Sequence, residues 1–150
     1  MGTQAIAIAA DLCRHFEGLS LKPYICPAGY ATIGYGATFY PNGKRVLITD
    51  SPITKEYADE ILAYDLEKFL AGVLVQCPVL SGQTNRLAAI TDFAFNLGLG
   101  RLKASTLKRK INAQDYEGAE KELAKWVRGG GRVLPGLVRR RNAEIALFQT

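Results

Sequence analysis

The stretch HFEGLSLKPYICPAGYATIGYG, residues 15–36, places the end of a helix directly before a tight hairpin, and this junction decides the fold. Apolar residues spaced four positions apart predict a helix over residues 4–17, with a stripe made by Ile8, Leu12 and Phe16. Gly18 ends this helix, because glycine readily takes the left-handed conformation that closes a helix. Glu17 is therefore the last residue of the predicted helix.

The hairpin that follows has one nearly bare face. Residues 21–25 and 30–35 have the composition of strands, and residues 27–29 (PAG) have that of a turn. Because side chains alternate along a strand, Thr32 shares its face with two glycines and is the only functional side chain there. Cys26 ends the partner strand, so we expect a thiol and a hydroxyl to share one pocket.

Glu17, Cys26 and Thr32 supply an acid, a thiol and a hydroxyl across a helix end and a hairpin. Such a set can split a bond with water, with Glu17 as the proton donor. Taken singly, the three have plainer interpretations: a solvated carboxylate, a small buried hydrophobe and a strand former. One histidine and three scattered cysteines offer neither a peptidase pair nor metal-ligand spacing. We therefore expect a hydrolase without a metal or cofactor.

The rest of the chain predicts a short strand, a long helix and then a helical lobe. Residues 44–48 follow a turn and have strand composition. Thr54 is a suitable N-cap, and apolar periodicity continues to about residue 75, where a Cys-Pro pair ends the helix. A later segment repeats the helical period with Leu87, Ile90, Phe93, Ala94 and Leu97. This order predicts an α+β fold with a small β-lobe and a larger helical lobe.

Several short motifs follow one another along the chain. EG, PY, PAG and TIGYG are followed by FNLGLGRLKASTL (95–107), by Trp126 with a GGG run, and by GLVRRRNAE (136–144). Together they resemble the phage-type lysozymes of glycoside hydrolase family 24, the lambdoid endolysins. The family pattern is Glu, eight residues, Asp or Cys, five residues, Thr, which Glu17, Cys26 and Thr32 match. The chain departs from it at Ala37, where many relatives carry His.

The resemblance implies a single lysozyme-like domain over residues 1–150. Its parts are an N-terminal helix (4–17), a β-lobe (18–53), a linking helix (54–75) and a helical lobe (79–150), with a cleft between the lobes. The implied reaction is hydrolysis of the β-1,4 bond between N-acetylmuramic acid and N-acetylglucosamine in bacterial peptidoglycan, which causes host cell lysis. The implied residues are Glu17, Cys26 and Thr32 for catalysis, and Phe95, Asn96 and Thr106 for saccharide binding.

The mechanism stays open at this level. A Cys26 thiolate could attack the anomeric carbon and retain configuration, or it could polarise a water held by Thr32 and invert it. Cys13 lies one helical turn before Glu17, so a disulfide between Cys13 and Cys26 could block the thiolate, as in related signal-anchored endolysins. In a reducing cytoplasm the three cysteines would instead stay thiols. One of residues 139–141, all arginine, could pair with Glu17, or the three could form a solvated face.

Charge is unevenly distributed. Residues 101–150 carry 12 Lys and Arg against 5 acids, whereas residues 1–100 carry 7 against 9. A basic half favours an anionic partner such as peptidoglycan and its envelope; nucleic acid is not expected, because the basic segments lack interleaved aromatic residues. The alternative is a non-catalytic basic protein that binds cell wall or nucleic acid.

Hydropathy indicates a globular chain. No run of 18 apolar residues occurs, and the apolar stretch 5–10 is short and lacks a preceding basic region, so we expect no membrane anchor or signal peptide. We expect a monomer made in the host cytoplasm that acts on the periplasmic cell wall. The resemblance implies release by a holin.

Overall fold

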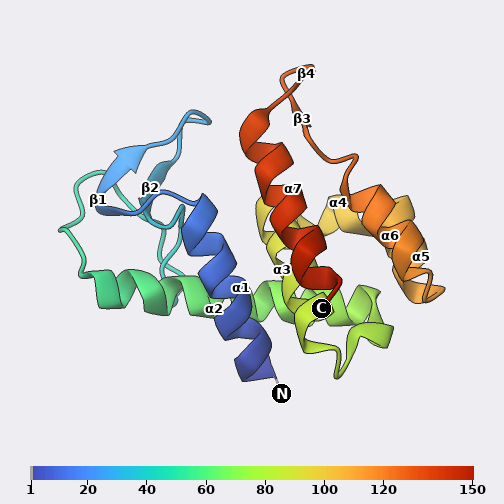
Figure 1. Ribbon diagram of the computed structural model, residues 1–150. Coiled ribbons are helices and arrows are strands. Elements are labelled where there is room, and N and C mark those ends of the chain that lie inside the picture. Colours follow the sequence, from blue (N-terminus) through green and yellow to red (C-terminus); the bar gives the residue numbers. More distant parts are fainter. Residues whose placement is uncertain (1) are drawn as a thin grey trace.

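The computed structural model describes residues 2–150 as a two-lobed molecule (Figure 1). The first residue of the expected domain 1–150 lies outside the described residues. The elements in chain order are α1 (Gly2–Phe16), β1 (Ser20–Ile25), β2 (Ala31–Gly34), α2 (Lys55–Gln76), the 3-10 turn η1 (Pro78–Leu80), α3 (Thr84–Leu97), α4 (Leu99–Lys103), α5 (Thr106–Asn112), α6 (Tyr116–Leu123), β3 (Arg128–Gly129), β4 (Arg132–Val133) and α7 (Pro135–Phe148).

The β-lobe is built on the antiparallel pair β1–β2. Tyr24 lies opposite Thr32, and a register irregularity separates this pair from the one between Ser20 and Gly34. The prediction of a strand over residues 44–48 is wrong. Within the described chain this segment contributes a single isolated β-bridge, between Arg45 and Phe39. After that bridge the Leu47 N–H donates to the Asp50 carboxylate at 2.9 Å, so it is not available for a hydrogen bond to a neighbouring strand.

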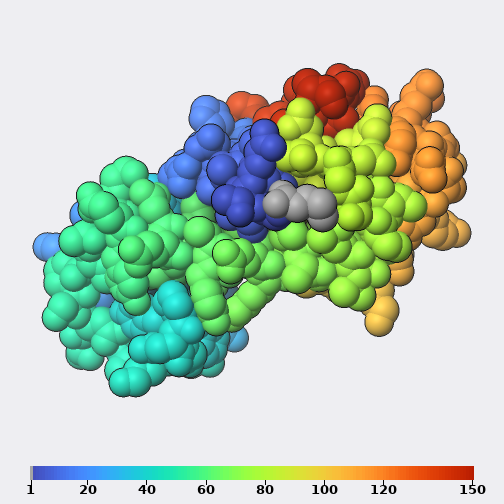
Figure 2. Space-filling model, turned by 90° about the horizontal axis from the view of Figure 1, so that it is seen from below, coloured from blue at the N-terminus to red at the C-terminus, as the bar shows by residue number. Residues whose placement is uncertain are grey.

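Helix α2 joins the two lobes. The Thr54 hydroxyl accepts a hydrogen bond from the Tyr57 N–H at 3.0 Å, so the expected N-cap starts the helix. Its 22 residues correspond to roughly 33 Å at about 1.5 Å per residue. Figure 1 shows α2 running from beneath the β-lobe into the helical lobe, and Figure 2 shows the two lobes as separate masses on either side of a waist.

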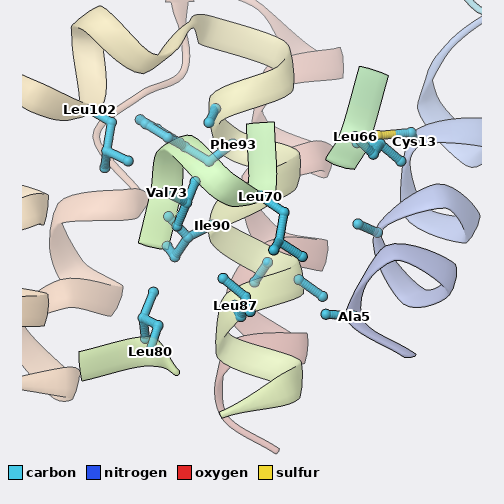
Figure 3. Close-up of a cluster of buried hydrophobic side chains, with 14 of the residues drawn as sticks. Ala5, Cys13, Leu66, Leu70, Val73, Leu80, Leu87, Ile90, Phe93 and Leu102 are labelled. Carbon is cyan, nitrogen blue, oxygen red and sulfur yellow. The ribbon is translucent and has the colours of Figure 1, made fainter. Parts of the chain in front are cut away.

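The hydrophobic core lies in the helical lobe around α3. Leu87, Ile90, Phe93 and Ala94 are almost completely buried, as the periodicity predicted, whereas Leu97 is half-buried. Figure 3 shows Leu87, Ile90 and Phe93 in one cluster with residues of α1, α2 and α4. Helix α3 is covered by α1, α2 and α7. The C-terminal end of α1 meets the N-terminal half of α7 through contacts of Arg140 with Phe16 and Glu17.

Residues at the helix starts and in one glycine-rich turn explain the smaller elements of the helical lobe. Ser105 caps α5 and Asp115 caps α6, each by accepting a backbone N–H three residues ahead. The GGG run turns the short hairpin β3–β4, with Gly130 and Gly131 at positive φ. Among the described residues, no helix is both long and apolar enough to cross a bilayer.

Candidate active site

Two cavities share Glu17 in their lining, and the first of them lies between the β-lobe and the helical lobe. The first, about 620 Å³, is bounded by the segment after β2, by α2 and by the end of α3. The second, about 680 Å³, is bounded by the end of α1 and the first turns of α7. Asn96 also lines both cavities. We call the two cavities together the cleft, with Glu17 and Asn96 at their junction.

Glu17 reaches the cleft from the end of α1, and its side chain is 26% exposed. Its backbone N–H continues the helix by donating to the Cys13 carbonyl at 2.7 Å. Gly36 faces the carboxylate: a Cβ atom at Gly36 would lie 3.9 Å from Glu17 Oε1, and its φ of +94° is one that residues with side chains rarely adopt. The backbone conformation therefore favours glycine at this position, while a Cβ at that distance would make only ordinary contact with the acid.

Arg140 holds the Glu17 carboxylate from the other side. Arg140 Nη1 donates to Glu17 Oε2 at 2.6 Å, although the two residues are 123 positions apart. The same guanidinium grips Asp92 with two bonds, Nε to Oδ2 at 2.9 Å and Nη2 to Oδ1 at 2.8 Å. Cys13 Sγ donates to Asp92 Oδ1 at 3.0 Å. The proton donor proposed from the sequence is thus tied to a buried network.

The ionisation of this network follows from its hydrogen bonds. Burial by itself would raise the pKa of Asp92, but hydrogen bonds with Glu144 and Arg140 hold it below its usual value. Burial would likewise lower the pKa of Arg140, whereas its bonds to Asp92 and Glu17 raise it. Burial, and next the hydrogen bond with Asp92, raise the pKa of Glu144 well above its usual value. Arg140 therefore stays charged and keeps Asp92 ionised.

We predict that Arg140→Met lowers the free energy of unfolding by about 3–5 kcal/mol, because it leaves the fully buried Asp92 carboxylate without its cation. The measurement is denaturant unfolding near neutral pH. Arg139→Met is the matched control, since Arg139 is exposed on the same helix, and its effect should stay within about 0.5 kcal/mol. Equal midpoints for the two variants would contradict the role given to Arg140.

Cys26 and Thr32 lie together at the turn end of the hairpin β1–β2. The Cys26 N–H and the Thr32 hydroxyl both donate to the Tyr30 carbonyl, each at 2.9 Å. Thr32 is 3% exposed and Cys26 is half-buried. The structure brings these two residues together, but neither contributes to the described lining of the two cavities, so the shared pocket stays a prediction.

The environment of Cys26 favours its thiolate. Hydrogen bonds from the Tyr30 backbone, then from the Thr32 side chain and the turn residues Ala28 and Gly29, lower the pKa of the Cys26 thiol, while desolvation acts in the opposite direction. Burial, aided by Asp92, raises the pKa of Cys13, and burial raises that of Cys77 to about 11. In the described chain none of the three cysteines is in a disulfide.

We predict that iodoacetamide alkylates Cys26 and leaves Cys13 and Cys77 unmodified in the folded protein. Only the thiolate reacts, so the rate should rise with pH to a midpoint below the ordinary thiol value of 9.0. Thr32→Val should move this midpoint upward, because it removes a hydrogen bond that lowers the Cys26 pKa. Peptide mass mapping across pH 6–10 checks this prediction; an unchanged midpoint in the Thr32 variant would refute it.

The saccharide contacts implied by the resemblance divide between two places. Phe95 and Asn96 line the cleft, and the Phe95 ring packs edge-on against Phe69 with centroids 5.5 Å apart. Thr106 lies elsewhere, at the start of α5, in a hollow shared with Trp126. Ala37 lines the first cavity and is held by paired backbone bonds to Ile33, so this position adds no polar side chain to the cleft.

Several residues that complete the site were missed or left undecided from the sequence. Arg140 was one of three undecided arginines, and the buried partners Asp92, Arg141 and Glu144 were not identified. One signal was available for Asp92: it is the only charged residue over positions 87–97, a helix segment that is mostly apolar. A carboxylate in such a segment indicates a buried cation elsewhere in the chain.

Known proteins share this architecture. Residues 14–144 match the model of the phage lysozyme family. An endolysin of Acyrthosiphon pisum secondary endosymbiont phage 1 is 41% identical over 143 residues, covering 93% of each chain. An endolysin of Bacillus phage B103 is 38% identical over 93% of this chain, which spans only 52% of that relative. The crystal structure of a P22 lysozyme mutant aligns with a TM-score of 0.78 at 28% identity, over 95% of each chain.

A small β-lobe, a helical lobe and an acid in the cleft between them define a lysozyme-like protein, and the predicted α+β fold class is confirmed. The chain belongs to the phage lysozyme family.

Proposed function

We propose that this protein is an endolysin muramidase that hydrolyses the β-1,4 bond between N-acetylmuramic acid and N-acetylglucosamine in peptidoglycan. Membership of the phage lysozyme family supports a glycoside hydrolase of this kind. The observation that carries the proposal is Glu17, a carboxylic acid held by Arg140 where the cavity between the lobes adjoins a second cavity beside α7. A glycan strand lying in the cleft would pass directly over this acid.

Glycoside hydrolysis needs a proton for the leaving oxygen and a second group on the opposite face of the sugar. We assign the first task to Glu17. Cys26 is proposed for the second, as a nucleophile or as the group that polarises a water held by Thr32. The hydrogen bonds that favour the Cys26 thiolate support this role. Because Cys26 lies outside the described lining of the cleft, the substrate has to extend to the turn end of the hairpin β1–β2 for the sulfur to act.

The biological setting is proposed on the same basis. The protein would accumulate in the host cytoplasm as a monomer, be released by a holin and act on the periplasmic cell wall. Family membership supports peptidoglycan as the partner, and the basic half of the chain suits an anionic envelope. Saccharide binding is assigned to Phe95 and Asn96 in the cleft and to Thr106 beside Trp126.

The alternative function, a non-catalytic basic protein that binds cell wall or nucleic acid, makes a different prediction in one experiment. Purified murein is mixed with the protein, and both the turbidity and the protein in the pellet are followed. An endolysin clears the suspension, so the pellet disappears with time. A protein that only binds would sediment with murein whose turbidity stays constant, and that result would overturn the proposed function.

A further inference from the structure

We propose that Arg141 is a positioning residue that fixes the Asn96 amide with its nitrogen toward the cleft, where Asn96 donates a hydrogen bond to an acetamido carbonyl of the bound glycan. The inference rests on the proposed function, because it concerns the same cleft. It assigns a task to a fully buried arginine that the catalytic scheme does not use.

Arg141 is held from several sides inside the helical lobe. Its Nη2 donates to Asn96 Oδ1 at 2.8 Å and to Glu144 Oε2 at 2.8 Å. Its guanidinium lies 5.1 Å from the centroid of the Phe93 ring. Glu144 is also fully buried, so neither partner of this pair has solvent as an alternative. A guanidinium fixed in this way presents its N–H groups to Asn96 in one orientation.

The chemistry of the two groups decides which way the amide points. A guanidinium only donates hydrogen bonds, so the Asn96 oxygen rather than its nitrogen must face Arg141. The amide is planar, and its NH₂ group therefore points away from Arg141. Within residues 2–150, Asn96 Nδ2 donates to no protein acceptor, although Asn96 lines both cavities of the cleft. Asn96 thus carries a donor without a protein partner in the cleft whose lining it shares with Glu17.

The donor selects the type of substrate group that it can bind. A neutral NH₂ group pairs with a carbonyl oxygen, and the acetamido groups are the carbonyl acceptors carried by every sugar of an N-acetylated glycan. An amide turned the other way would place its oxygen toward the cleft and meet the same carbonyl with repulsion. Arg141 therefore acts on the substrate through Asn96 and not by contact.

The first test is Asn96→Asp. The aspartate keeps an oxygen toward Arg141 and replaces the cleft-facing NH₂ with a second oxygen, so the fold is retained while the donor is lost. We expect the apparent KM for solubilised N-acetylated glycan strands to rise about tenfold or more, with kcat within about twofold, and no loss in Tm. Rates are compared at the pH optimum of each variant, because the new charge lies near Glu17.

Asn142→Asp is the matched control, since Asn142 is exposed on the same helix as Arg141 and the charge change is identical. The control should keep the KM of the unchanged protein. Equal KM values for the two aspartate variants, in a protein that still clears murein, would overturn this inference alone. Failure of the unchanged protein to clear murein would instead overturn the proposed function.

The role of Arg141 is tested by a double-mutant comparison. Glutamine at position 141 can donate or accept, so Arg141→Gln leaves the Asn96 amide free to turn over. We expect Arg141→Gln to raise KM in the native background and to add nothing in an Asn96→Ala background. An equal increase in both backgrounds would contradict positioning through Asn96. Arg141→Lys keeps a cation that only donates hydrogen bonds, so most of the increase in KM seen with Arg141→Gln should be absent. The lysine variant replaces the glutamine variant in this comparison if the latter does not fold.

Discussion

Glu17→Gln is expected to slow the clearing of a murein suspension by about 10³-fold, the largest effect of any single substitution in this protein. General acid catalysis contributes between about 10² and 10⁴ to a rate, and glutamine cannot give up a proton to the leaving oxygen. The glutamine carbonyl can still accept the hydrogen bond from Arg140, and Arg140 keeps both bonds to Asp92. The variant should therefore fold normally and still sediment with murein.

The control for this experiment is Glu117→Gln. It makes the same chemical change at an exposed residue of α6 that does not line the cleft. It should clear murein at the rate of the unchanged protein. A Glu17→Gln variant that is folded and clears murein within tenfold of that rate would show that the proton comes from another group.

The second large effect concerns Cys26. We expect Cys26→Ala to lose at least about 10²-fold in activity and Cys26→Asp to keep activity within about tenfold, because an ionised group opposite the acid is what glycoside hydrolysis requires. The same backbone N–H groups that lower the pKa of Cys26 would also hold an aspartate ionised. Initial clearing rates per folded molecule are the measurement.

Cys77→Ala controls for the loss of a thiol, since Cys77 is buried between α2 and η1 and away from the hairpin. Its clearing rate per folded molecule should not change, although its stability will fall. A fully active Cys26→Ala variant would remove Cys26 from the mechanism and leave Glu17 to work with water alone. Low activity in both Cys26 variants would show that position 26 requires sulfur itself.

The elements that could be predicted are those encoded by neighbouring residues. Thr54, Ser105 and Asp115 each cap a helix through bonds that span three positions, so their sequence context was sufficient. The β1–β2 hairpin follows from its own turn in the same way. Residues 44–48 have strand composition, yet strand formation also needs a partner, and the Asp50 side chain takes the Leu47 N–H that a ladder would use.

The candidate site was predictable only in part, because its remaining members meet through tertiary packing. Glu17 was identified from its place between a helix end and a hairpin, but its partner lies 123 positions later. Which of three consecutive arginines turns inward depends on the rotation of α7, and the sequence alone does not supply that angle. In the structure Arg140 and Arg141 are buried and Arg139 is exposed. Long-range pairing of this kind needs coordinates.

The most direct test of the account is the chemical nature of the ends that the protein creates in peptidoglycan. Muropeptides from a digest are analysed by mass, comparing the unchanged protein with Glu17→Gln. We predict new N-acetylmuramic acid reducing ends, each heavier by one water than the anhydro form, and their absence with the variant. Anhydro ends, reducing N-acetylglucosamine ends, or glycan strands left intact while peptides are cut would each contradict a muramidase that uses Glu17 as its acid.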